Sequence, residues 1–511
     1  GKGTQNCQHL ESSNPGFPSL TPRAKRAAFA GNDNQRKPRF TVERLGYALA
    51  NATSRTGDDK PAQDRYALRR KIGDGVPMKI VGGKWSNWSG GVVCKPGRIV
   101  APRDEVELAA TIRQSDGPIR TPGSGHSFTP VNETNGTLVD LAAFTGLKGI
   151  DLHRETATLG AATPLWRVGP LLHAKGLGLK NMGDIDRQTL GGVVGTGTHG
   201  TGRKLKSFSA EVAGFRLLLA NGELINCSAA ENSEIFSAGR TSLGVYGVMT
   251  EITMNVRPAY KLVEQNFVMP IAELFRKLDS LVNDNRHFEF FWFPYSDVAV
   301  CKSLNESEEA APEPRSAEEM YERGERASSD QRAFGWINEA LPYAPFMLKS
   351  AHRLFSSLMP GAGKVRWSHE IFPSPRTTRF NEMEYAVPYA KGPDAIREIV
   401  ETIRRRRINT GFPIEYRSVA EDDVWMSPFY GRESATIAVH QYHRVDTKRL
   451  FDACEAIFRA YEGRPHWGKR HTRTADELAA LYPKFEQFRA VRRVLDPRGK
   501  FLNAHLRAMF E

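Results

Sequence analysis

The chain has 511 residues, of which 40% are hydrophobic and 25% are charged, and its formal net charge is +13. This length exceeds what one hydrophobic core usually serves, so we expect at least two domains. The composition is typical of a water-soluble globular protein, and no run approaches the roughly 18 apolar residues that a membrane-spanning helix requires. We therefore expect no integral membrane segment.

Residues 1–77 form a basic segment rich in Pro and Asn, with one short helical pattern at residues 42–50. Residues 1–80 hold 15 Lys and Arg against 7 Asp and Glu, so much of the positive charge lies here. Such a tail could attract nucleic acid, but no recognisable nucleic-acid-binding module accompanies it. We interpret it as a flexible extension or surface arm rather than a domain, and we expect no nucleic-acid partner.

The five cysteines are odd in number and lack close pairing: Cys7, Cys94, Cys227, Cys301 and Cys454. This argues against a disulfide framework and against a cysteine-rich metal site, so no metal is expected. The sequence starts without methionine and without an apolar signal core. A cytoplasmic location is favoured, and a periplasmic or secreted one stays open because the N-terminus can have been processed.

From residue 78 the pattern changes to strands mixed with helices. Strand signals recur at residues 78–82, 98–101, 138–140, 157–160 and 210–219. Helical spacing covers residues 104–114, with Asp104 placed to cap it, and residues 164–174. Asn221 and Gly222 then form a turn that predicts a hairpin. This order predicts an α+β domain.

Two glycine-rich segments lie within this domain, at residues 121–128 (TPGSGHSF) and 190–202 (LGGVVGTGTHGTG). Glycine tolerates positive φ and lets other groups approach the backbone closely. Successive unblocked N–H groups form a concavity suited to an anion such as a pyrophosphate. One such segment alone would often be an ordinary tight turn, but two segments with a histidine in each predict a long phosphate-containing cofactor held from both sides.

The composition changes near residue 258, where we place a domain boundary. Beyond it, strand patterns at residues 288–294, 381–387, 414–417 and 435–442 accompany helical patterns at residues 394–405 and 447–461. This predicts an antiparallel sheet with flanking helices for residues 259–511. Residues 302–331 are acidic and are interpreted as a surface insertion.

The motifs occur in the order GSGHS (residues 123–127), NMGDID (residues 181–186) and GTHGTG (residues 197–202). This order resembles the vanillyl-alcohol-oxidase (PCMH-type FAD-binding) superfamily of flavoproteins. Within it, the chain is most similar to the aldonolactone oxidases (L-gulonolactone, galactonolactone and D-arabinono-1,4-lactone oxidases), with alditol oxidase as a cousin. The resemblance covers roughly residues 81–511. It implies an FAD-binding domain over residues 78–258 and a substrate-binding domain over residues 259–511, whose C-terminal segment returns to the FAD-binding domain.

The resemblance implies FAD as cofactor, attached covalently through His126, although a histidine that only bonds the loop backbone is the alternative. The cofactor-binding residues that it implies come from three glycine-rich stretches and from Asp184: Gly123, Ser124, Gly125, His126, Ser127, Asp184, Gly192, Gly197, Thr198, His199, Gly200, Gly202, Gly247, Val248 and Ile252. For His199, a structural role is as consistent with the sequence as a catalytic one.

Glu415 and Arg417 lie two residues apart on a predicted strand, so they share one face. A carboxylate and a guanidinium in that arrangement can bind a polyol or lactone together, and an exposed ion pair is the alternative. The match to the Glu-x-Arg motif of aldonolactone and alditol oxidases favours a catalytic pair. By the same resemblance Lys469 is catalytic, although a lysine on a short turn is usually just solvated. His440 and Tyr442 share a strand face and are predicted to line the substrate pocket, with a satisfied core histidine as the alternative for His440.

Gly183 and Asp184 follow Asn181 and Met182. In the family the position of Gly183 lies near the flavin edge where oxygen arrives, and glycine leaves room there, which favours an oxidase; a backbone requirement for glycine is the alternative. Alditol oxidases carry serine where this chain has Asp184, and this departure favours a lactone, or an unknown polyol, over a plain polyol. Asp184 is therefore also predicted to contact substrate.

These features predict FAD-dependent oxidation of a CH–OH group of a sugar-derived lactone, with O2 as acceptor giving H2O2. Three alternatives stay open. The first is an alditol or other carbohydrate oxidase, and the second is a dehydrogenase that uses another electron acceptor. The third is a flavin-free binding protein that keeps the scaffold.

Overall fold

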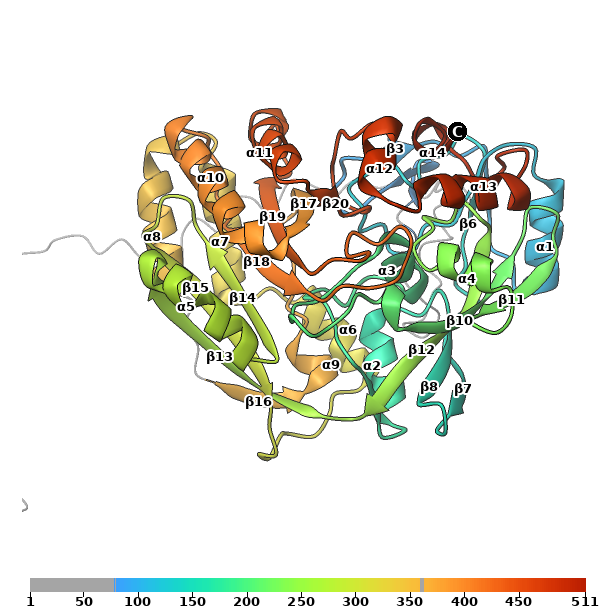
Figure 1. Cartoon of the computed structure of the whole chain (residues 1–511), viewed down its shortest axis with the longest axis horizontal. Coiled ribbons are helices and arrows are strands. Elements are labelled where there is room, and N and C mark those ends of the chain that lie inside the picture. Colours follow the sequence, from blue (N-terminus) through green and yellow to red (C-terminus); the bar gives the residue numbers. More distant parts are fainter. Residues whose placement is uncertain (1–77, 79, 359–362) are drawn as a thin grey trace, which may run out of the picture. The chain divides into compact units, whose positions relative to one another are not determined.

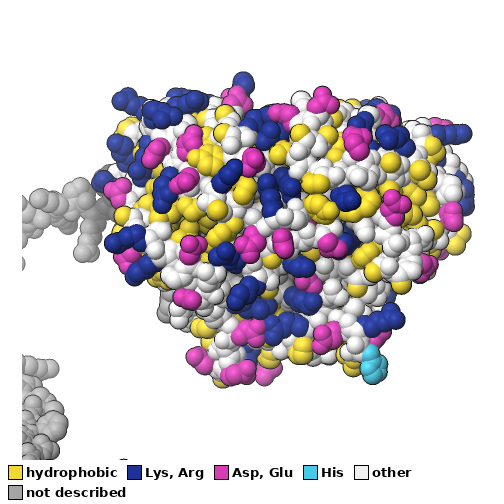
Figure 2. Space-filling view, in the orientation of Figure 1, with side chains coloured by type: hydrophobic (Ala, Val, Ile, Leu, Met, Phe, Trp, Pro, Cys, Tyr) yellow, Lys and Arg dark blue, Asp and Glu magenta, His cyan; other side chains and the backbone are white. Residues whose placement is uncertain are grey.

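The computed structural model describes residues 78, 80–358 and 363–511, and Figure 1 shows how their elements are arranged. The basic extension and the helix predicted at residues 42–50 lie outside the described residues. None of the helices in the described part is long and apolar enough to cross a membrane. On the face drawn in Figure 2, Lys and Arg side chains alternate with Asp and Glu rather than gathering in one area.

The described chain up to residue 258 contains two main sheets. A three-stranded sheet has the order β4–β6–β5 and is parallel, while a larger antiparallel sheet has the order β11–β10–β12–β8–β7, with β9 also pairing with β12. The elements of this part are β1 (Ile80–Val81), β2 (Lys84–Ser86), β3 (Val93–Cys94), β4 (Arg98–Val100), α1 (Glu105–Gln114), β5 (Ile119–Arg120), β6 (Thr137–Val139), β7 (Leu147–Asp151), β8 (Thr156–Gly160), α2 (Leu165–His173), β9 (Leu177–Leu179), α3 (Leu190–Thr196), η2 (Ser209–Glu211), β10 (Val212–Leu218), β11 (Leu224–Ser228), α4 (Ser233–Gly239) and β12 (Val248–Pro258).

Local signals in the sequence account for several of these elements. Asp104 caps α1 by accepting a hydrogen bond from the Glu107 amide at 2.8 Å, as predicted. The predicted turn at Asn221 and Gly222 joins the antiparallel strands β10 and β11. The second glycine-rich segment differs from expectation, because it begins as a helix, α3, which ends where Gly197 adopts φ 69°.

The rest of the chain is built on one eight-stranded sheet of order β16–β13–β15–β14–β18–β19–β17–β20. Its described strands are antiparallel to their neighbours. The elements are β13 (Lys261–Pro270), α5 (Ile271–Asp284), β14 (His287–Trp292), β15 (Val298–Glu306), α6 (Ala317–Glu325), α7 (Ser329–Ala340), η3 (Pro345–Met347), α8 (Leu348–Leu358), β16 (Lys364–Trp367), α9 (Ser368–Ile371), β17 (Phe380–Pro388), η4 (Tyr389–Lys391), α10 (Gly392–Arg405), β18 (Ile414–Val419), β19 (Ser434–Tyr442), α11 (Lys448–Ala460), β20 (Arg464–Pro465), α12 (Ala475–Leu481), α13 (Phe485–Leu495) and α14 (Ala504–Phe510).

Side-chain alternation gives the centre of this sheet one apolar face and one charged face. Apolar residues such as Phe290, Tyr385 and Ile437 pack in one core with residues of α5, α10 and α11. Figure 1 shows α5 and α10 on the side of the sheet away from α3. The intervening residues carry charge and make up the opposite face: Glu289, Lys302, Glu382, Glu384, Glu415, Arg417 and His440. This charged face is where the site lies.

Two further features position the site. β15 continues through Glu306, which places Lys302 in the sheet rather than in the insertion expected from residue 302, and the following residues fold into α6 and α7. Near the C-terminus the chain meets the first part again, because the Ile119 amide donates to Lys500 O at 2.9 Å and Arg120 Nη1 donates to Phe501 O at 2.7 Å.

Candidate active site

A cavity lies between residues 120–128, α3 and residues 243–249, and it reaches Phe380 and Lys469 of the second part. Its lining thus comes from three separate glycine-containing segments of the first part of the chain and from the second part.

The loop of residues 123–127 presents its backbone to this cavity. In the described part of the chain, none of its amide N–H groups donates to a protein acceptor. A Cβ at Gly123 would lie 2.2 Å from Thr189 Oγ1, and Gly125 adopts φ +74°, so both positions require glycine. Consecutive free amides bind anions such as a pyrophosphate. The loop thus fits the phosphate-containing cofactor that the sequence predicts.

His126 lines the same cavity, with its ring stacked on Trp88 at a centroid distance of 5.4 Å. Burial, reinforced by the positive charges of Lys469 and Arg187, lowers the pKa of His126 to about 4. The imidazole is therefore neutral near pH 7, with an electron pair available on one ring nitrogen.

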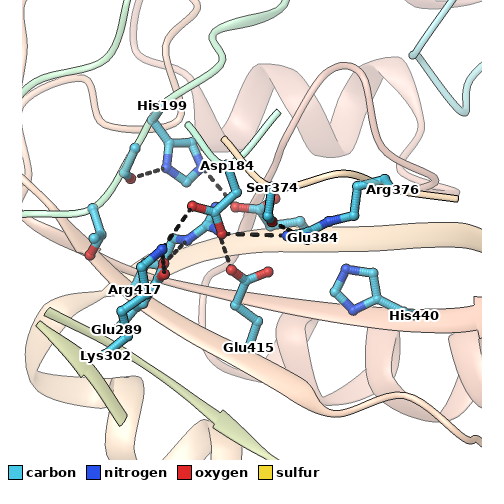
Figure 3. Close-up of polar contacts among 12 residues, drawn as sticks. Asp184, His199, Glu289, Lys302, Ser374, Arg376, Glu384, Glu415, Arg417 and His440 are labelled. Carbon is cyan, nitrogen blue, oxygen red and sulfur yellow. Dashed lines mark hydrogen bonds and ion pairs between the residues drawn. The ribbon is translucent and has the colours of Figure 1, made fainter. Parts of the chain in front are cut away.

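Arg417 stands at the centre of a charged cluster on the sheet (Figure 3). Its Nε donates to Glu289 Oε2 at 2.8 Å, and its Nη2 donates to Asp184 Oδ2 at 2.6 Å and contacts the Glu415 carboxylate. Oxygens of the three carboxylates lie within 4.8 Å of one another. Lys302 Nζ is 3.1 Å from Glu289 Oε1, which adds a second buried cation to the cluster.

A third cation reaches this cluster from the segment between α9 and β17. Arg376 Nη2 lies 3.6 Å from Asp184 Oδ2, and Figure 3 shows it approaching Asp184 from the side opposite to Arg417. The Ser374 amide also donates to Asp184 O at 3.1 Å. Asp184 therefore connects the first part of the chain both to β18 and to the segment between α9 and β17.

The carboxyl groups of the cluster differ in their acidity. Burial raises the pKa of Glu415 to about 7, and the nearby charges of Glu289 and Asp184 act in the same direction, while Arg417 opposes them. Burial would also raise the pKa of Asp184, but Lys302 and Arg417 outweigh it and lower that pKa. Near pH 7, Glu415 is therefore present in both its protonated and its ionised form, next to an ionised Asp184.

Lys469 links the cavity to the charged face. Its ammonium group contacts the Glu382 carboxylate and lies 3.9 Å from Glu384 Oε2. Burial opposes ionisation of Glu382, but Lys469 and His440 outweigh it and lower its pKa to about 2. Glu384 Oε1 in turn lies 2.7 Å from His199 Nε2, and His199 Nδ1 lies 2.8 Å from Gly200 O.

His440 and Tyr442 sit two residues apart on β19 but meet different partners. His440 Nε2 lies 3.5 Å from Glu382 Oε1, and its Nδ1 is buried without a hydrogen-bond partner in the described chain. Tyr442 instead donates to Glu339 of α7 and packs in a cluster with Phe128 and Phe380. Only His440 therefore joins the charged groups around Lys469.

The predicted cofactor residues divide into two groups. Those that line the cavity are Gly123, Ser124, Gly125, His126, Ser127, Gly192, Thr198 and Gly247. The others lie beside it: Asp184 and His199 in the charged clusters, and Gly197, Gly200, Gly202, Val248 and Ile252 in the surrounding packing. At Gly200, for example, a Cβ would lie 2.2 Å from Met182 O, so packing alone requires glycine. A Cβ at Gly183 would lie 3.1 Å from His199 O, which is tight.

Sequence reasoning missed several charged residues of the site: Glu289, Lys302, Arg376, Glu382 and Glu384. A signal was present for three of them. Glu289 interrupts the apolar run FEFFW at residues 288–292, and Glu382 and Glu384 alternate with apolar residues in NEMEY at residues 381–385. Carboxylates on one face of an otherwise buried strand indicate a functional face, because buried charge requires partners.

Comparison with known proteins identifies relatives of this chain. A family model described as D-arabinono-1,4-lactone oxidase matches residues 252–509, and one described as an FAD binding domain matches residues 96–228. L-gulono-1,4-lactone dehydrogenase of Mycobacterium tuberculosis is 37% identical over 431 residues, covering 83% of this chain and 98% of that protein. L-gulonolactone oxidase of Bos taurus is 31% identical over 448 residues, covering 84% and 98%.

More distant matches follow. Alditol oxidase of a Streptomyces species is 28% identical over 439 residues, covering 83% of this chain and 99% of that protein. Among solved structures, cholesterol oxidase from Brevibacterium sterolicum matches with a TM-score of 0.71 at 16% identity, covering 85% of this chain and 98% of that one. At 16% identity this structural match supports the fold but not a shared activity.

The fold and the site define a flavoenzyme of the vanillyl-alcohol-oxidase type, which confirms the fold class predicted from the sequence. It is an FAD-dependent oxidoreductase that acts on CH–OH groups. Within that class, the chain belongs to the D-arabinono-1,4-lactone oxidase family.

Proposed function

We propose that the chain oxidises a CH–OH group of a sugar-derived 1,4-lactone of the L-gulono, L-galactono or D-arabinono type. The observation that carries this proposal is that two cations meet the same charged sheet face: Arg417 lies on it, and Lys469, which lines the cavity, contacts Glu382 on it. The names of the M. tuberculosis and Bos taurus relatives support the lactone class. Cations on such a face can stabilise the negative oxygen that forms when a hydroxyl loses its proton.

FAD would be held by residues 123–127, α3 and residues 243–249, which line the cavity. When bound, it supplies the two-electron acceptor for the hydrogen that leaves the substrate carbon. His126 is the proposed covalent anchor, through a bond from an imidazole nitrogen to the methyl group of the isoalloxazine ring. The new C–N bond would replace a C–H and an N–H bond, and the two electrons and two protons released would pass to the acceptor that reoxidises the enzyme. The neutral state of His126 supports this role, because the nitrogen that forms the bond requires a free electron pair.

Arg417 is the proposed anchor for the substrate oxygen. Its Nε and Nη2 are engaged by carboxylates, which leaves Nη1 without an acceptor in the described chain. Arginine offers donors in a fixed planar geometry and stays charged, so Nη1 can meet the oxygen on which charge develops. Glu415, on the same strand face, would orient the neighbouring hydroxyl groups.

His440 is the proposed acceptor of the hydroxyl proton. Glu382 lies on the Nε2 side of the ring, which favours the tautomer with hydrogen on Nε2 and leaves Nδ1 as the acceptor. Nδ1 is buried and has no partner in the part of the chain that the structure describes. Lys469, held by Glu382, would keep a positive charge next to both the cavity and the substrate.

Dioxygen is the proposed electron acceptor, with H2O2 as its product. Glycine at position 183 supports this choice through the resemblance, in which glycine there leaves room for oxygen. In the structure a Cβ at this position would lie 3.1 Å from His199 O. The name of the M. tuberculosis relative, a dehydrogenase, makes an acceptor other than oxygen the alternative.

A second candidate function is alditol oxidation in the same pocket. The Streptomyces alditol oxidase match and the Glu-x-Arg pair on β18 favour it. Asp184 disfavours it, since an ionised carboxylate occupies a position where the resemblance leads us to expect serine.

One experiment tests these alternatives together. The purified enzyme is offered L-gulono-1,4-lactone, D-arabinono-1,4-lactone and xylitol, with peroxide measured in air and reduction of an artificial dye measured under argon. We expect turnover of a lactone with peroxide release. Turnover of xylitol alone would replace the lactone proposal by the alditol one, and dye reduction without peroxide in air would replace oxygen by another acceptor.

A further inference from the structure

Glu289 and Lys302 face the charged cluster but have no place in the chemistry described so far. The sheet aligns them in one row, because Glu289 on β14 is the cross-strand partner of both Lys302 on β15 and Arg417 on β18. The side chain of Glu289 is 3% exposed and that of Lys302 is 15% exposed. Directly opposite side chains on neighbouring strands interact, so Lys302, Glu289 and Arg417 form one row of interacting charges across three strands.

We propose that Glu289 is a positioning residue that fixes the guanidinium of Arg417 toward the substrate, with Lys302 as its counter-ion. This inference rests on the proposed function, in which Arg417 meets the substrate oxygen. Neither residue needs to touch the substrate for this role.

The hydrogen bonds define how the guanidinium is held. Glu289 Oε2 accepts from Arg417 Nε at 2.8 Å, while Asp184 Oδ2 accepts from Nη2 at 2.6 Å. Two fixed points on one edge of a planar group set both its plane and its rotation. Glu289 does not contact Nη1, but by fixing the plane of the guanidinium it sets the direction in which Nη1 points.

The charge of Glu289 is balanced independently of Arg417. Its other oxygen, Oε1, lies 3.1 Å from Lys302 Nζ, and the same ammonium group lies 3.6 Å from Asp184 Oδ1. Burial acts against a charged lysine, but Asp184 and Glu289 outweigh it and raise the pKa of Lys302. Because Lys302 neutralises this carboxylate, the charge of Arg417 stays available for the substrate.

The same row influences Glu415. The charge of Glu289 contributes to the raised pKa of Glu415, so removing that charge lowers the pKa of Glu415. Removing the charge of Lys302 acts in the opposite direction. A neutral pair at both positions leaves the net charge near Glu415 unchanged.

The test compares Glu289→Gln, Lys302→Met and the double variant with the wild type. Glu370→Gln is the matched control, because Glu370 is equally buried and pairs with Arg315 at 3.0 Å outside this sheet. Measurements are flavin content, kcat and KM for the lactone that the wild type oxidises, and the pH profile of kcat/KM.

We expect Glu289→Gln to lower kcat/KM by about tenfold to a hundredfold, as displacement of a reacting group does, with flavin content unchanged. The ionisation seen near neutral pH should move down in Glu289→Gln, move up in Lys302→Met, and return toward the wild-type position in the double variant. Glu370→Gln should leave both the rate and the profile unchanged.

Two outcomes overturn the inference: wild-type kinetics in Glu289→Gln, or single variants whose profiles do not move in opposite directions. A wild type that oxidises no lactone contradicts the proposed function instead. In that case the position of Arg417 is compared in crystal structures of the wild type and Glu289→Gln, and an unmoved guanidinium overturns the inference separately. If a single variant fails to fold, the double variant decides by its kinetics: it keeps the charge balance but lacks Glu289, so kcat/KM lowered by about tenfold to a hundredfold with full flavin content supports the inference, and wild-type kinetics overturns it.

Discussion

His199 and Glu384 share a single proton across the contact between the second glycine-rich segment and β17. His199 Nδ1 lies 2.8 Å from Gly200 O, and because a carbonyl oxygen only accepts, this nitrogen carries hydrogen. Nε2 lies 2.7 Å from Glu384 Oε1, a distance that requires one proton between them. The pair is therefore an imidazolium with a carboxylate or a neutral imidazole with a carboxylic acid. Burial opposes ionisation of Glu384, but His199 outweighs it and lowers the pKa of Glu384 well below its usual range.

Removing this imidazole should destabilise the protein. His199→Ala leaves the buried Glu384 carboxylate with Lys469 at 3.9 Å as its ion-pair partner among the described residues, and breaking a buried pair in this way costs about 3–5 kcal/mol. Urea unfolding at pH 7 measures the loss, with the exposed His153→Ala as control, for which we expect a change within about 0.5 kcal/mol. Because the pKa of Glu384 is depressed, the stabilisation is present above the ordinary Glu pKa and fades as the pH falls toward the folded-state value. Equal stability of His199→Ala and the wild type at pH 7 would contradict the shared-proton pair.

Glu415 predicts a pH dependence of the opposite sign. Its pKa of about 7 lies above the ordinary value of 4.5, so the folded chain binds its proton more tightly than the unfolded chain. This contribution to stability is complete below the ordinary value and is lost as the pH rises through 7. Glu415→Gln cannot ionise, and its stability should not show this fall between pH 5 and pH 8. In the same range kcat/KM of the wild type should rise as Glu415 ionises. A wild-type profile that is flat near pH 7 would contradict the assignment of this ionisation to Glu415.

Much of the fold was predictable from the sequence, because its signals are local or periodic. The Asp104 cap, the hairpin at Asn221 and Gly222, and the alternating strands of the second part all follow from short patterns. The fold class required the resemblance as well, since the motif order identified the superfamily. The second glycine-rich segment was only partly predicted, because contacts with the first part stabilise α3 despite its glycines.

The charged clusters were less predictable. Pairing of Glu415 and Arg417 follows from their spacing, but the strand register that places Glu289 and Lys302 beside Arg417 connects residues more than 100 positions apart. No single-sequence pattern specifies such a register. The contact of Arg376 with Asp184 depends on the path of a segment that lacks regular structure, which periodicity cannot predict.

His126 should keep the flavin attached after denaturation. The wild-type protein precipitated with acid is expected to retain the flavin absorbance, and the peptide that contains His126 should carry the mass of the flavin. In His126→Ala the flavin should leave with the supernatant, although FAD still binds to the folded protein through the free amides of residues 123–127. Colour that stays with precipitated His126→Ala would assign the bond to another residue, and a colourless wild-type precipitate would exclude the bond.

Gly183 should control access of oxygen. The resemblance places this position at the flavin edge where oxygen arrives. In Gly183→Ala the new Cβ would lie 3.1 Å from His199 O, so the backbone at one of these two positions has to shift. We expect reoxidation of the reduced enzyme by air to slow by about tenfold, equal to a barrier increase of about 1.4 kcal/mol. Reduction of an artificial dye should stay unchanged. Gly149→Ala, whose Cβ meets nothing within 4 Å, is the control. A loss of both activities in Gly183→Ala would indicate a packing role instead.

Lys469 should matter for the chemical step as well as for stability. Its ammonium group contacts Glu382 and lines the cavity, so Lys469→Met removes the positive charge that borders both the substrate face and the cofactor. Loss of one group that stabilises a developing negative charge typically lowers kcat by about 10²–10³-fold. Lys206→Met, at an exposed position, serves as the control. Removing Lys469 also removes a charge that lowers the pKa of Glu382, so that pKa should rise, and the double variant Lys469→Met/Glu382→Gln should recover stability but not rate. Recovery of the rate in this double variant would mean that Lys469 only neutralises Glu382 and has no direct part in catalysis.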